Sequence, residues 1–190
     1  PLFKKRGLLS KLIIPNLKDY QKLKSSIKNS YLKSDINDEN MSNVLSLSKL
    51  LKISDKSFIK SMETFVGLPH RYETFLKRKE ITFINDSKAT SFQATKFALE
   101  NSSNIFWILG GLPKKNDKVI INDLKKNIAK VYIIGKHIKF FEKQIKGKVN
   151  YSVTKNLKNS IIRVLKDIKK FNIKKNTILL SPSAASYDQY

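Results

Sequence analysis

Apolar positions recur at helical spacing between residues 40 and 66, and they fall in short runs beyond residue 67. The first stretch holds an apolar stripe made of Met41, Val44, Leu45, Leu47 and Leu51. Spacings of three and four residues are typical of one helix face, so we expect a helix that carries Asn40 and Asn43 one turn apart on the same side. A second helix is expected after Ser54, a good N-cap residue, with Gly67 and Pro69 as stop signals.

Beyond Gly67 the chain alternates between short apolar runs and helical stretches. Runs rich in β-branched and aromatic residues predict strands at 71–76, 81–85, 105–109, 131–134, 149–153 and 177–180, the first two as a hairpin. Helices are expected at 91–101, 120–129, 138–145 and 155–170. Helical crossovers between strands indicate a parallel sheet, so the predicted fold class is α/β with a doubly wound, mostly parallel sheet.

The pattern also predicts two domains. Residues 1–35 show no sustained period, and with the two helices after them they read as the tail of another unit, so we expect domains at 1–66 and 67–190. Open α/β sheets bind ligands at the carboxyl ends of their strands. We therefore expect the polar loops that follow strands to gather along one edge; these loops are 85–90, 110–115, Gly135 and 181–186.

Composition excludes several kinds of chemistry. The 190 residues include no cysteine and two histidines, which rules out a disulfide framework, a thiol nucleophile and a cysteine-ligated metal. His70 has no second histidine nearby, so we expect no metal site among these residues. No apolar run approaches the roughly 18 residues of a membrane span, and we expect a cytoplasmic protein without a membrane partner.

The net charge of +23 favours polyanionic partners. Only four of the 38 basic residues are arginine, however, and lysines are spread along almost every segment, which is typical of codon bias in an AT-rich genome rather than of one binding stripe. We expect no nucleic-acid partner. The alternative hypothesis is a free-standing basic α/β module that binds nucleotide or nucleic acid, and a steep loss of affinity with salt would distinguish it.

The loop at 85–90 combines a carboxylate, an ammonium group and two hydroxyls at a strand-to-helix turn. Backbone N–H groups at a helix start attract anions, Lys88 adds a positive charge, and Asp86 suits Mg²⁺, a ribose or an amine. The alternative is helix capping by one of the loop hydroxyls or by Ser91, with Asp86 and Lys88 solvated.

Two further segments carry candidate chemistry. The glycines at 110–111 allow a sharp turn or a close approach to a ligand, and Lys114 follows them, although no P-loop pattern occurs in the chain. His70 and Arg71 lie at the expected domain junction, where ligand clefts prefer to form. Arg71 suits a planar phosphate or adenine partner, and the alternative is a surface ion pair with Glu73.

Four segments, in this order, resemble the Mur ligases. They are Gly67-Leu68-Pro69-His70-Arg71-Tyr72-Glu73, Phe83-Ile84-Asn85-Asp86-Ser87-Lys88-Ala89-Thr90, Ile108-Leu109-Gly110-Gly111, and Leu179-Leu180-Ser181-Pro182 continued by Ser186-Tyr187-Asp188-Gln189-Tyr190. The resemblance covers about residues 39–190. The segment at 85–90 resembles the members of the family that add D-glutamate, and a relative that adds a different amino acid is the less favoured alternative.

The resemblance implies a three-domain cytoplasmic enzyme of peptidoglycan synthesis. In such an enzyme ATP, with Mg²⁺, phosphorylates the alanyl carboxylate of UDP-N-acetylmuramoyl-L-alanine. The amine of D-glutamate then attacks the acyl phosphate and releases phosphate. For this chain it implies a Rossmann-like C-terminal domain at 67–190, preceded by the helical tail of the central ATP-binding domain at 1–66.

The resemblance also implies residue roles. On the nucleotide side, Asn40 and Asn43 lie near ATP, His70 and Arg71 flank the adenine and phosphates, and Asp86 contacts the ribose or orders the nucleotide. The residues that match the family's D-glutamate-binding positions are Lys88, Thr90, Lys114, Ser186 and Tyr187. Lys88 and Asp86 are the catalytic candidates.

Departures from the family pattern limit what we expect of this chain alone. Glu39, Ser91 and the pair Ser183-Ala184 replace residues that are common in the family. The chain has no P-loop, uridine-nucleotide domain or modified lysine that holds Mg²⁺, so we expect the metal ligands mainly in the absent central domain. We expect this piece to be a monomer that is inactive without the N-terminal and central domains.

Overall fold

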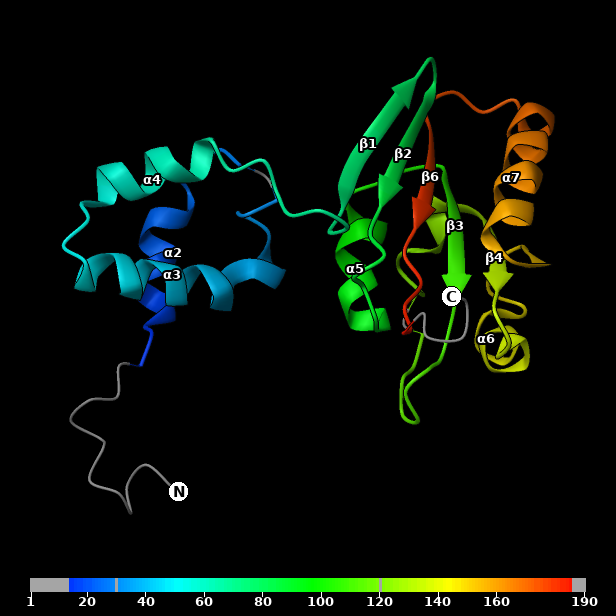
Figure 1. Ribbon diagram of the computed structural model, residues 1–190, viewed down its shortest axis with the longest axis horizontal. Helices are drawn as coiled ribbons and strands as arrows, with labels where there is room; N and C mark the ends of the chain where they lie inside the picture. The colour runs from blue at the N-terminus through cyan, green and yellow to red at the C-terminus, as the bar shows by residue number, and fades with distance from the viewer. Residues whose placement is uncertain (1–13, 30, 120, 186–190) are drawn as a thin grey trace. The chain divides into compact units, whose positions relative to one another are not determined.

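The computed structural model describes residues 14–29, 31–119 and 121–185, which form two compact units (Figure 1). The first unit runs to Val66 and the second begins at Gly67. The two units have separate hydrophobic clusters, so each packs around its own apolar residues.

The first unit is a cluster of helices. It contains α2 (Leu17–Lys24), a 3₁₀ turn η2 (Asp35–Asn37), α3 (Asp38–Leu50) and α4 (Asp55–Glu63). Its core consists of Tyr20, Ile27, Leu32, Met41, Leu45 and Phe58. The helices predicted from residue 40 and after Ser54 are confirmed, and the Ser54 hydroxyl caps α4 by accepting from the Ser57 N–H.

Helix α2 lies in a stretch for which the sequence predicts no regular element. It has eight residues, and among them Tyr20 alone is buried. The Asn16 side chain caps its first turn, and the Tyr20 hydroxyl donates to the Leu32 carbonyl at 3.2 Å. A short helix with one buried side chain has a weak periodic signal, so tertiary contacts decide that it forms.

The second unit is built on one six-stranded sheet in the order β1-β2-β6-β3-β4-β5. The strands are β1 (Glu73–Arg78), β2 (Ile81–Asn85), β3 (Ile105–Gly110), β4 (Ile128–Ile134), β5 (Tyr151–Lys155) and β6 (Asn176–Leu180). Strand β1 is antiparallel to β2, and the other neighbouring pairs are parallel. The predicted α/β class with a mostly parallel sheet is confirmed, although β5 begins two residues later than expected.

Helices cover both faces of this sheet. Helices α5 (Phe92–Glu100) and α6 (Ile138–Ile145) pack on one face, and α7 (Leu157–Phe171) packs on the other (Figure 1). In β3, Trp107 points to the first face and Phe106 to the second, and both are fully buried. A strand buried on both faces needs apolar residues throughout, which explains why 105–109 is a continuous apolar run. None of the described helices is both long and apolar enough to cross a membrane.

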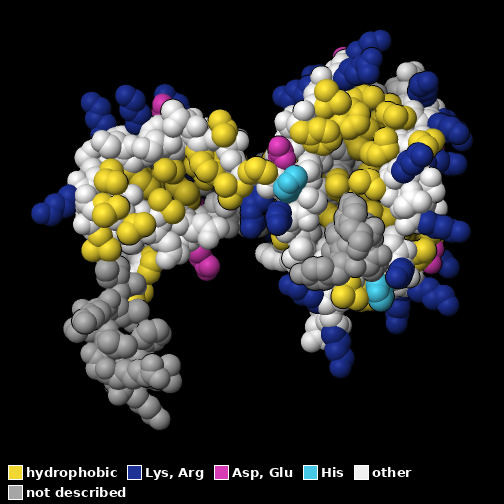
Figure 2. All heavy atoms as spheres, in the orientation of Figure 1, with side chains coloured by type: hydrophobic (Ala, Val, Ile, Leu, Met, Phe, Trp, Pro, Cys, Tyr) yellow, Lys and Arg dark blue, Asp and Glu magenta, His cyan; other side chains and the backbone are white. Residues whose placement is uncertain are grey.

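Helix α7 leaves part of its face of the sheet open. Phe75 and Leu76 of β1 are 60% and 43% exposed. Leu76 pairs with Phe83 of β2, whose ring lies 6.1 Å from the ring of Phe75. Figure 2 shows apolar surface on the second unit at this hairpin. On this face, the side chains of β3 are therefore fully buried, those of β2 are only partly buried, and Phe75 and Leu76 of β1 are exposed.

The helix predicted at 120–129 is wrong. The described part of this stretch contains a 3₁₀ turn, η3 (Lys125–Asn127), and then enters β4 at Ile128. Ile121, Leu124 and Ile128 have helical spacing and are buried, but Ile128 pairs with Ile105 of β3. Pairing with a central strand satisfies the backbone of these residues, so the non-local sheet overrides the local pattern.

Candidate functional site

Three of the four loops that the sequence predicts at the carboxyl edge of the sheet are joined there by hydrogen bonds. The Asp86 N–H donates to the Leu180 carbonyl at 2.8 Å, and the Gly110 N–H donates to the Pro182 carbonyl at 3.0 Å. The Ser183 N–H donates to the Ala89 carbonyl, also at 3.0 Å. The loop after β4 differs, since its Gly135 N–H bonds to Lys155 of β5. The loops after β2, β3 and β6 thus form one connected surface.

The segment before β1 is fastened to the loop after β2. The His70 ring nitrogen Nδ1 lies 2.8 Å from Asn85 Nδ2, and the Lys88 N–H donates to the His70 carbonyl at 3.0 Å. His70 and Tyr72 both have left-handed backbones, with φ of 64° and 47°. Strained backbone of this kind is held only where the surroundings determine it, and it is common at ligand sites.

The expected alternative for Arg71, an ion pair with Glu73, is not what the structure shows. The Glu73 carboxylate accepts from the His70 N–H at 2.9 Å and lies 3.8 Å from the His70 ring. Arg71 is exposed, and it acts on Asp86 through space by lowering the pKa of that carboxyl. The guanidinium therefore faces solvent beside the loop after β2.

Asp86 is buried rather than solvated. Its side chain is 7% exposed, and it accepts from the Tyr72 N–H at 3.0 Å and from the Ser181 hydroxyl at 2.7 Å. Burial raises the pKa of Asp86 to about 6, against the lowering effects of these two hydrogen bonds and of Arg71. The carboxyl thus joins three segments, and its buried position suits a residue that orders the segment before β1 more than one that contacts a ligand directly.

We expect Asp86→Asn to change how stability depends on pH. The pKa of Asp86 is above its ordinary value of 3.8, so folding favours the protonated form, and this contribution is lost as pH rises from about 4 to about 6. The loss amounts to about 3 kcal/mol. Urea unfolding between pH 4 and 7 should show that the asparagine variant lacks this decrease.

Asp167 provides the control for that measurement. Burial alone would raise its pKa, but the Lys130 ammonium at 2.8 Å and the Tyr132 hydroxyl hold the pKa below its ordinary value. Its contribution is therefore fully present above its ordinary pKa of 3.8 and lost as pH falls below that value, so for this control the unfolding measurement is extended down to about pH 2. Asp167→Asn should remove a slope of the opposite sign, and equal pH profiles for the two variants would contradict the assignment for Asp86.

Three further candidate residues of this edge are exposed. Lys88 and Thr90 on the loop after β2 and Lys114 on the loop after β3 all face solvent. The loop after β3 is held by an isolated bridge in which the Leu112 N–H donates to the Ala185 carbonyl at 2.7 Å. Ser186 and Tyr187 lie outside the described residues, which end at Ala185 in this loop.

The capping alternative for the loop at 85–90 is correct in part. Ser91 is the N-cap of α5, and its hydroxyl accepts from the Ala94 N–H at 3.2 Å. Capping by Ser91 and the exposed Lys88 are as this alternative predicts, whereas the buried Asp86 contradicts it.

Asn40 and Asn43 belong to the first unit. Both are exposed on α3, and Asn43 Nδ2 donates to the Glu39 carbonyl at 2.8 Å, one turn earlier. Their shared helix face is as predicted, and their role toward a nucleotide stays a prediction.

Sequence reasoning missed Thr95, which is fully buried on α5. Its hydroxyl lies 2.9 Å from the Ser181 hydroxyl and 2.7 Å from the Ser183 hydroxyl. The available signal was a polar residue on the apolar face of the predicted helix, between Phe92 and Ala98. Such a residue needs a hydrogen-bond partner when it is buried.

The residues at this edge do not fit Mg²⁺. Within the described ranges, no group of three or more histidine or acidic side chains is placed to hold a metal ion. The carboxylates of Asp86 and Glu73 are engaged by protein donors. That Mg²⁺ is held mainly by the central domain stays a prediction.

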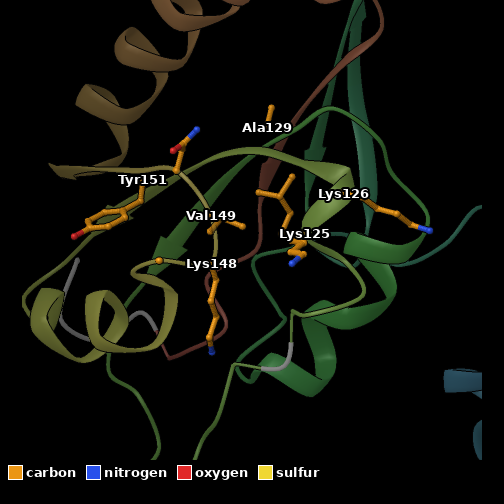
Figure 3. Close-up of a pocket in the computed structure, with 9 residues that line it drawn as sticks. Lys125, Lys126, Ala129, Lys148, Val149 and Tyr151 are labelled. Carbon is orange, nitrogen blue, oxygen red and sulfur yellow. The ribbon is translucent and has the colours of Figure 1, made fainter.

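A cavity of about 780 Å³ lies at the opposite edge, at the amino ends of β4 and β5. Lys125, Lys126 and Lys148 line it together with Tyr151. In Figure 3 the side chains of Lys126, Lys148 and Tyr151 point in three different directions. Because they do not converge on one point, this cavity is a weaker candidate than the carboxyl edge.

No protein-family profile matches the chain. Curated relatives are similar to it over most of its length. The UDP-N-acetylmuramoylalanine–D-glutamate ligase of Agrobacterium fabrum is 32% identical over 159 residues, which are 84% of this chain and 34% of that protein. The protein of the same name from a Wolbachia of Brugia malayi is 34% identical over 154 residues, 81% of this chain and 31% of that protein. The chain thus spans about a third of the length of these relatives.

A solved structure supports the fold. MurF from Acinetobacter baumannii aligns with 80% of this chain and 35% of its own, with a TM-score of 0.65 and 13% sequence identity. At that identity the likeness concerns the fold alone, and it agrees with the mixed α/β architecture described above.

Proposed function

This chain belongs to the Mur ligase family, and we propose that it supplies the D-glutamate side of a cytoplasmic ligase that makes a peptidoglycan precursor. The reaction would join D-glutamate to UDP-N-acetylmuramoyl-L-alanine, with ATP converted to ADP and phosphate. Other domains would hold the uridine substrate and the Mg²⁺ of ATP. In this proposal residues 1–66 end the central ATP-binding domain and 67–190 form the C-terminal domain.

One observation carries the proposal: exposed Lys88, Thr90 and Lys114 stand on loops that the sheet fastens together at its carboxyl edge. D-Glutamate carries two carboxylates, and two ammonium groups on fixed loops are suited to bind them through charge-assisted hydrogen bonds. Among the described residues, no hydrogen bond or ion pair engages the side-chain ends of these three residues, so they are available to a ligand.

The chemistry needs positioning and neutralisation of charge. ATP would transfer its γ-phosphoryl group to the alanyl carboxylate, and the D-glutamate amine would attack the resulting carbonyl carbon. A tetrahedral intermediate would then expel phosphate. Holding the amine next to the acyl phosphate makes the step effectively unimolecular, and Lys88 would offset the negative charge that accumulates there.

His70 and Arg71 would serve the nucleotide. Both are exposed on the strained segment before β1. The buried carboxylate of Asp86 fixes that segment by accepting a hydrogen bond from the Tyr72 N–H. In this proposal Arg71 meets phosphate or adenine with its planar guanidinium, and Asp86 acts as a positioning residue. A direct contact of Asp86 with the ribose is the less favoured form of the proposal, because its side chain is 7% exposed.

The experiment that tests this function is a titration of the pure chain with D-glutamate, with L-glutamate as the control. We expect saturable binding of D-glutamate and binding of the L-enantiomer at least about tenfold weaker, because the two carboxylates and the amine must match at once. Equal binding of both enantiomers, or no binding of either, would contradict the proposal.

We also expect the chain alone to release no phosphate from ATP in the presence of D-glutamate and UDP-N-acetylmuramoyl-L-alanine. In this proposal other domains hold the uridine substrate, and within the described ranges no cluster of acidic or histidine side chains is placed to hold the metal. A colorimetric phosphate assay checks this, and release that depends on D-glutamate would show that the missing groups are present after all.

A further inference from the structure

We propose that Thr95 is a positioning residue for the D-glutamate side of this edge, because its buried hydroxyl fastens the loop after β6 through Ser181 and Ser183. The identity of the ligand rests on the proposed function, whereas the fastening is a property of the chain itself. Thr95 touches no substrate in this proposal and acts through the loop.

The Thr95 hydroxyl has three hydrogen-bonding neighbours in the buried interior. Thr95, Ser181 and Ser183 are each fully buried. Thr95 Oγ1 lies 2.9 Å from Ser181 Oγ, 2.7 Å from Ser183 Oγ and 3.3 Å from the Ser91 carbonyl. Buried hydroxyls that satisfy one another rigidify a site; without the Thr95 hydroxyl, Ser181 would keep only Asp86, and Ser183 would keep only the Ser181 carbonyl at 3.4 Å. Helix α5 thus holds the loop after β6, whose residues Ser181 and Ser183 lie 86 and 88 positions from Thr95 in sequence.

The loop needs this support because its backbone is strained. Ser183 has a φ of 58°, in the left-handed region that residues other than glycine rarely adopt. Its N–H donates to the Ala89 carbonyl at 3.0 Å, and its hydroxyl meets Thr95. Two anchors therefore fix Ser183, one on the loop that carries Lys88 and one on α5.

The same hydroxyl chain reaches Asp86. Ser181 has one hydroxyl proton and two neighbours, Asp86 Oδ2 at 2.7 Å and Thr95 Oγ1 at 2.9 Å. When Asp86 is ionised, Ser181 donates to it and accepts from Thr95. When Asp86 is protonated, the direction reverses, and Ser181 donates to Thr95. A hydroxyl at position 95 serves both states, whereas a valine side chain serves neither.

The hydrogen bonds of Thr95 affect the proposed ligand site because the loop after β6 is joined to the loop that carries Lys114. Two residues after Ser183, Ala185 forms the bridge with Leu112 that also holds the loop before Lys114. Loss of the hydrogen bond between Ser183 and Thr95 would therefore disturb both the loop that carries Lys88 and the loop that carries Lys114. We infer that Thr95 sets the distance between the two ammonium groups that the proposed function assigns to the carboxylates.

The test compares Thr95→Val with Thr95→Ser in the full chain. Valine keeps the shape and removes the hydroxyl, whereas serine keeps the hydroxyl. Thr177→Val is the matched control, because Thr177 is also buried, 8% exposed, but lies near the start of β6. Ser183→Ala is a second variant that removes one partner of the hydroxyl and leaves the helix unchanged.

Amide hydrogen exchange at Ser183 and Ala185 is the first measurement. We expect about tenfold faster exchange in Thr95→Val, because a lost buried hydrogen bond opens the loop locally. Ser183→Ala should accelerate exchange in the same direction. Thr95→Ser and Thr177→Val should stay within about twofold of the parent chain, and the amides of β4 should be unchanged in all variants.

Affinity for D-glutamate is the second measurement, and we expect it to be about tenfold weaker in Thr95→Val and restored in Thr95→Ser. Unchanged exchange at Ser183 and Ala185 in both Thr95→Val and Ser183→Ala would overturn the proposal, as would a serine variant that behaves like valine. If the parent chain does not bind D-glutamate, the proposed function fails, and the exchange measurement still decides whether Thr95 fastens the loop.

Discussion

Gly110→Ala should prevent the second unit from folding stably. Gly110 ends β3 with a φ of 143°, and a Cβ atom built there would lie 2.1 Å from the Ile134 carbonyl oxygen. That oxygen belongs to β4, which pairs with β3 along its length, so it cannot move aside. Backbone strain and overpacking together should lower the free energy of unfolding by about 3–5 kcal/mol.

Urea unfolding followed by tryptophan fluorescence measures this effect. The chain has one tryptophan, Trp107, which is buried in β3 and reports on the second unit. Gly147→Ala is the control, because Gly147 has a φ of 77° but open space around it, and its cost should be about 1 kcal/mol. Similar losses for the two variants would show that the backbone contact at Ile134 is not the cause.

Lys88→Met should weaken the binding of D-glutamate by about 30- to 100-fold. Methionine keeps most of the length and removes the ammonium group, so a charge-assisted hydrogen bond to a carboxylate is lost. Lys88 is exposed, and stability should hardly change. Titration of the variant with D-glutamate checks the affinity, and urea unfolding checks that the fold is kept.

The matched control for Lys88 is Lys126→Met. Lys126 is also exposed, but it lines the cavity at the opposite edge of the sheet. We expect its affinity for D-glutamate to equal that of the parent chain. If both variants lose affinity equally, general attraction by the charge of +23 explains the binding, and the carboxyl edge is not the site.

The sequence predicts those helices and strands whose buried residues follow a regular pattern of apolar positions. The continuous apolar run at 105–109 lies within the central strand β3, and the stripe in 155–170 belongs to α7, which runs to Phe171. Helix α2 and the start of β4 were not predictable in this way. Tyr20 of α2 is held by Leu32, and Ile128 is held by β3, so distant partners decide both.

In the candidate site, too, some features follow from local sequence patterns and others depend on distant residues. The sequence predicts that the loops after β2, β3 and β6 share an edge, since parallel strands end on one side of a sheet. It leaves open whether Asp86 is solvated, and the structure buries it between Tyr72 and Ser181. Thr95 gives almost no sequence signal, because its partners lie 86 and 88 residues away.

By itself, then, the sequence determines the α/β class, the edge where ligands are expected and the family resemblance, because periodicity and short motifs are local properties of the chain. The tertiary structure decides which polar side chains are buried and which are exposed. Burial and hydrogen bonding depend on residues far apart in sequence, which is why the carboxylate of Asp86 is buried and the ammonium of Lys88, two positions further along the chain, is exposed.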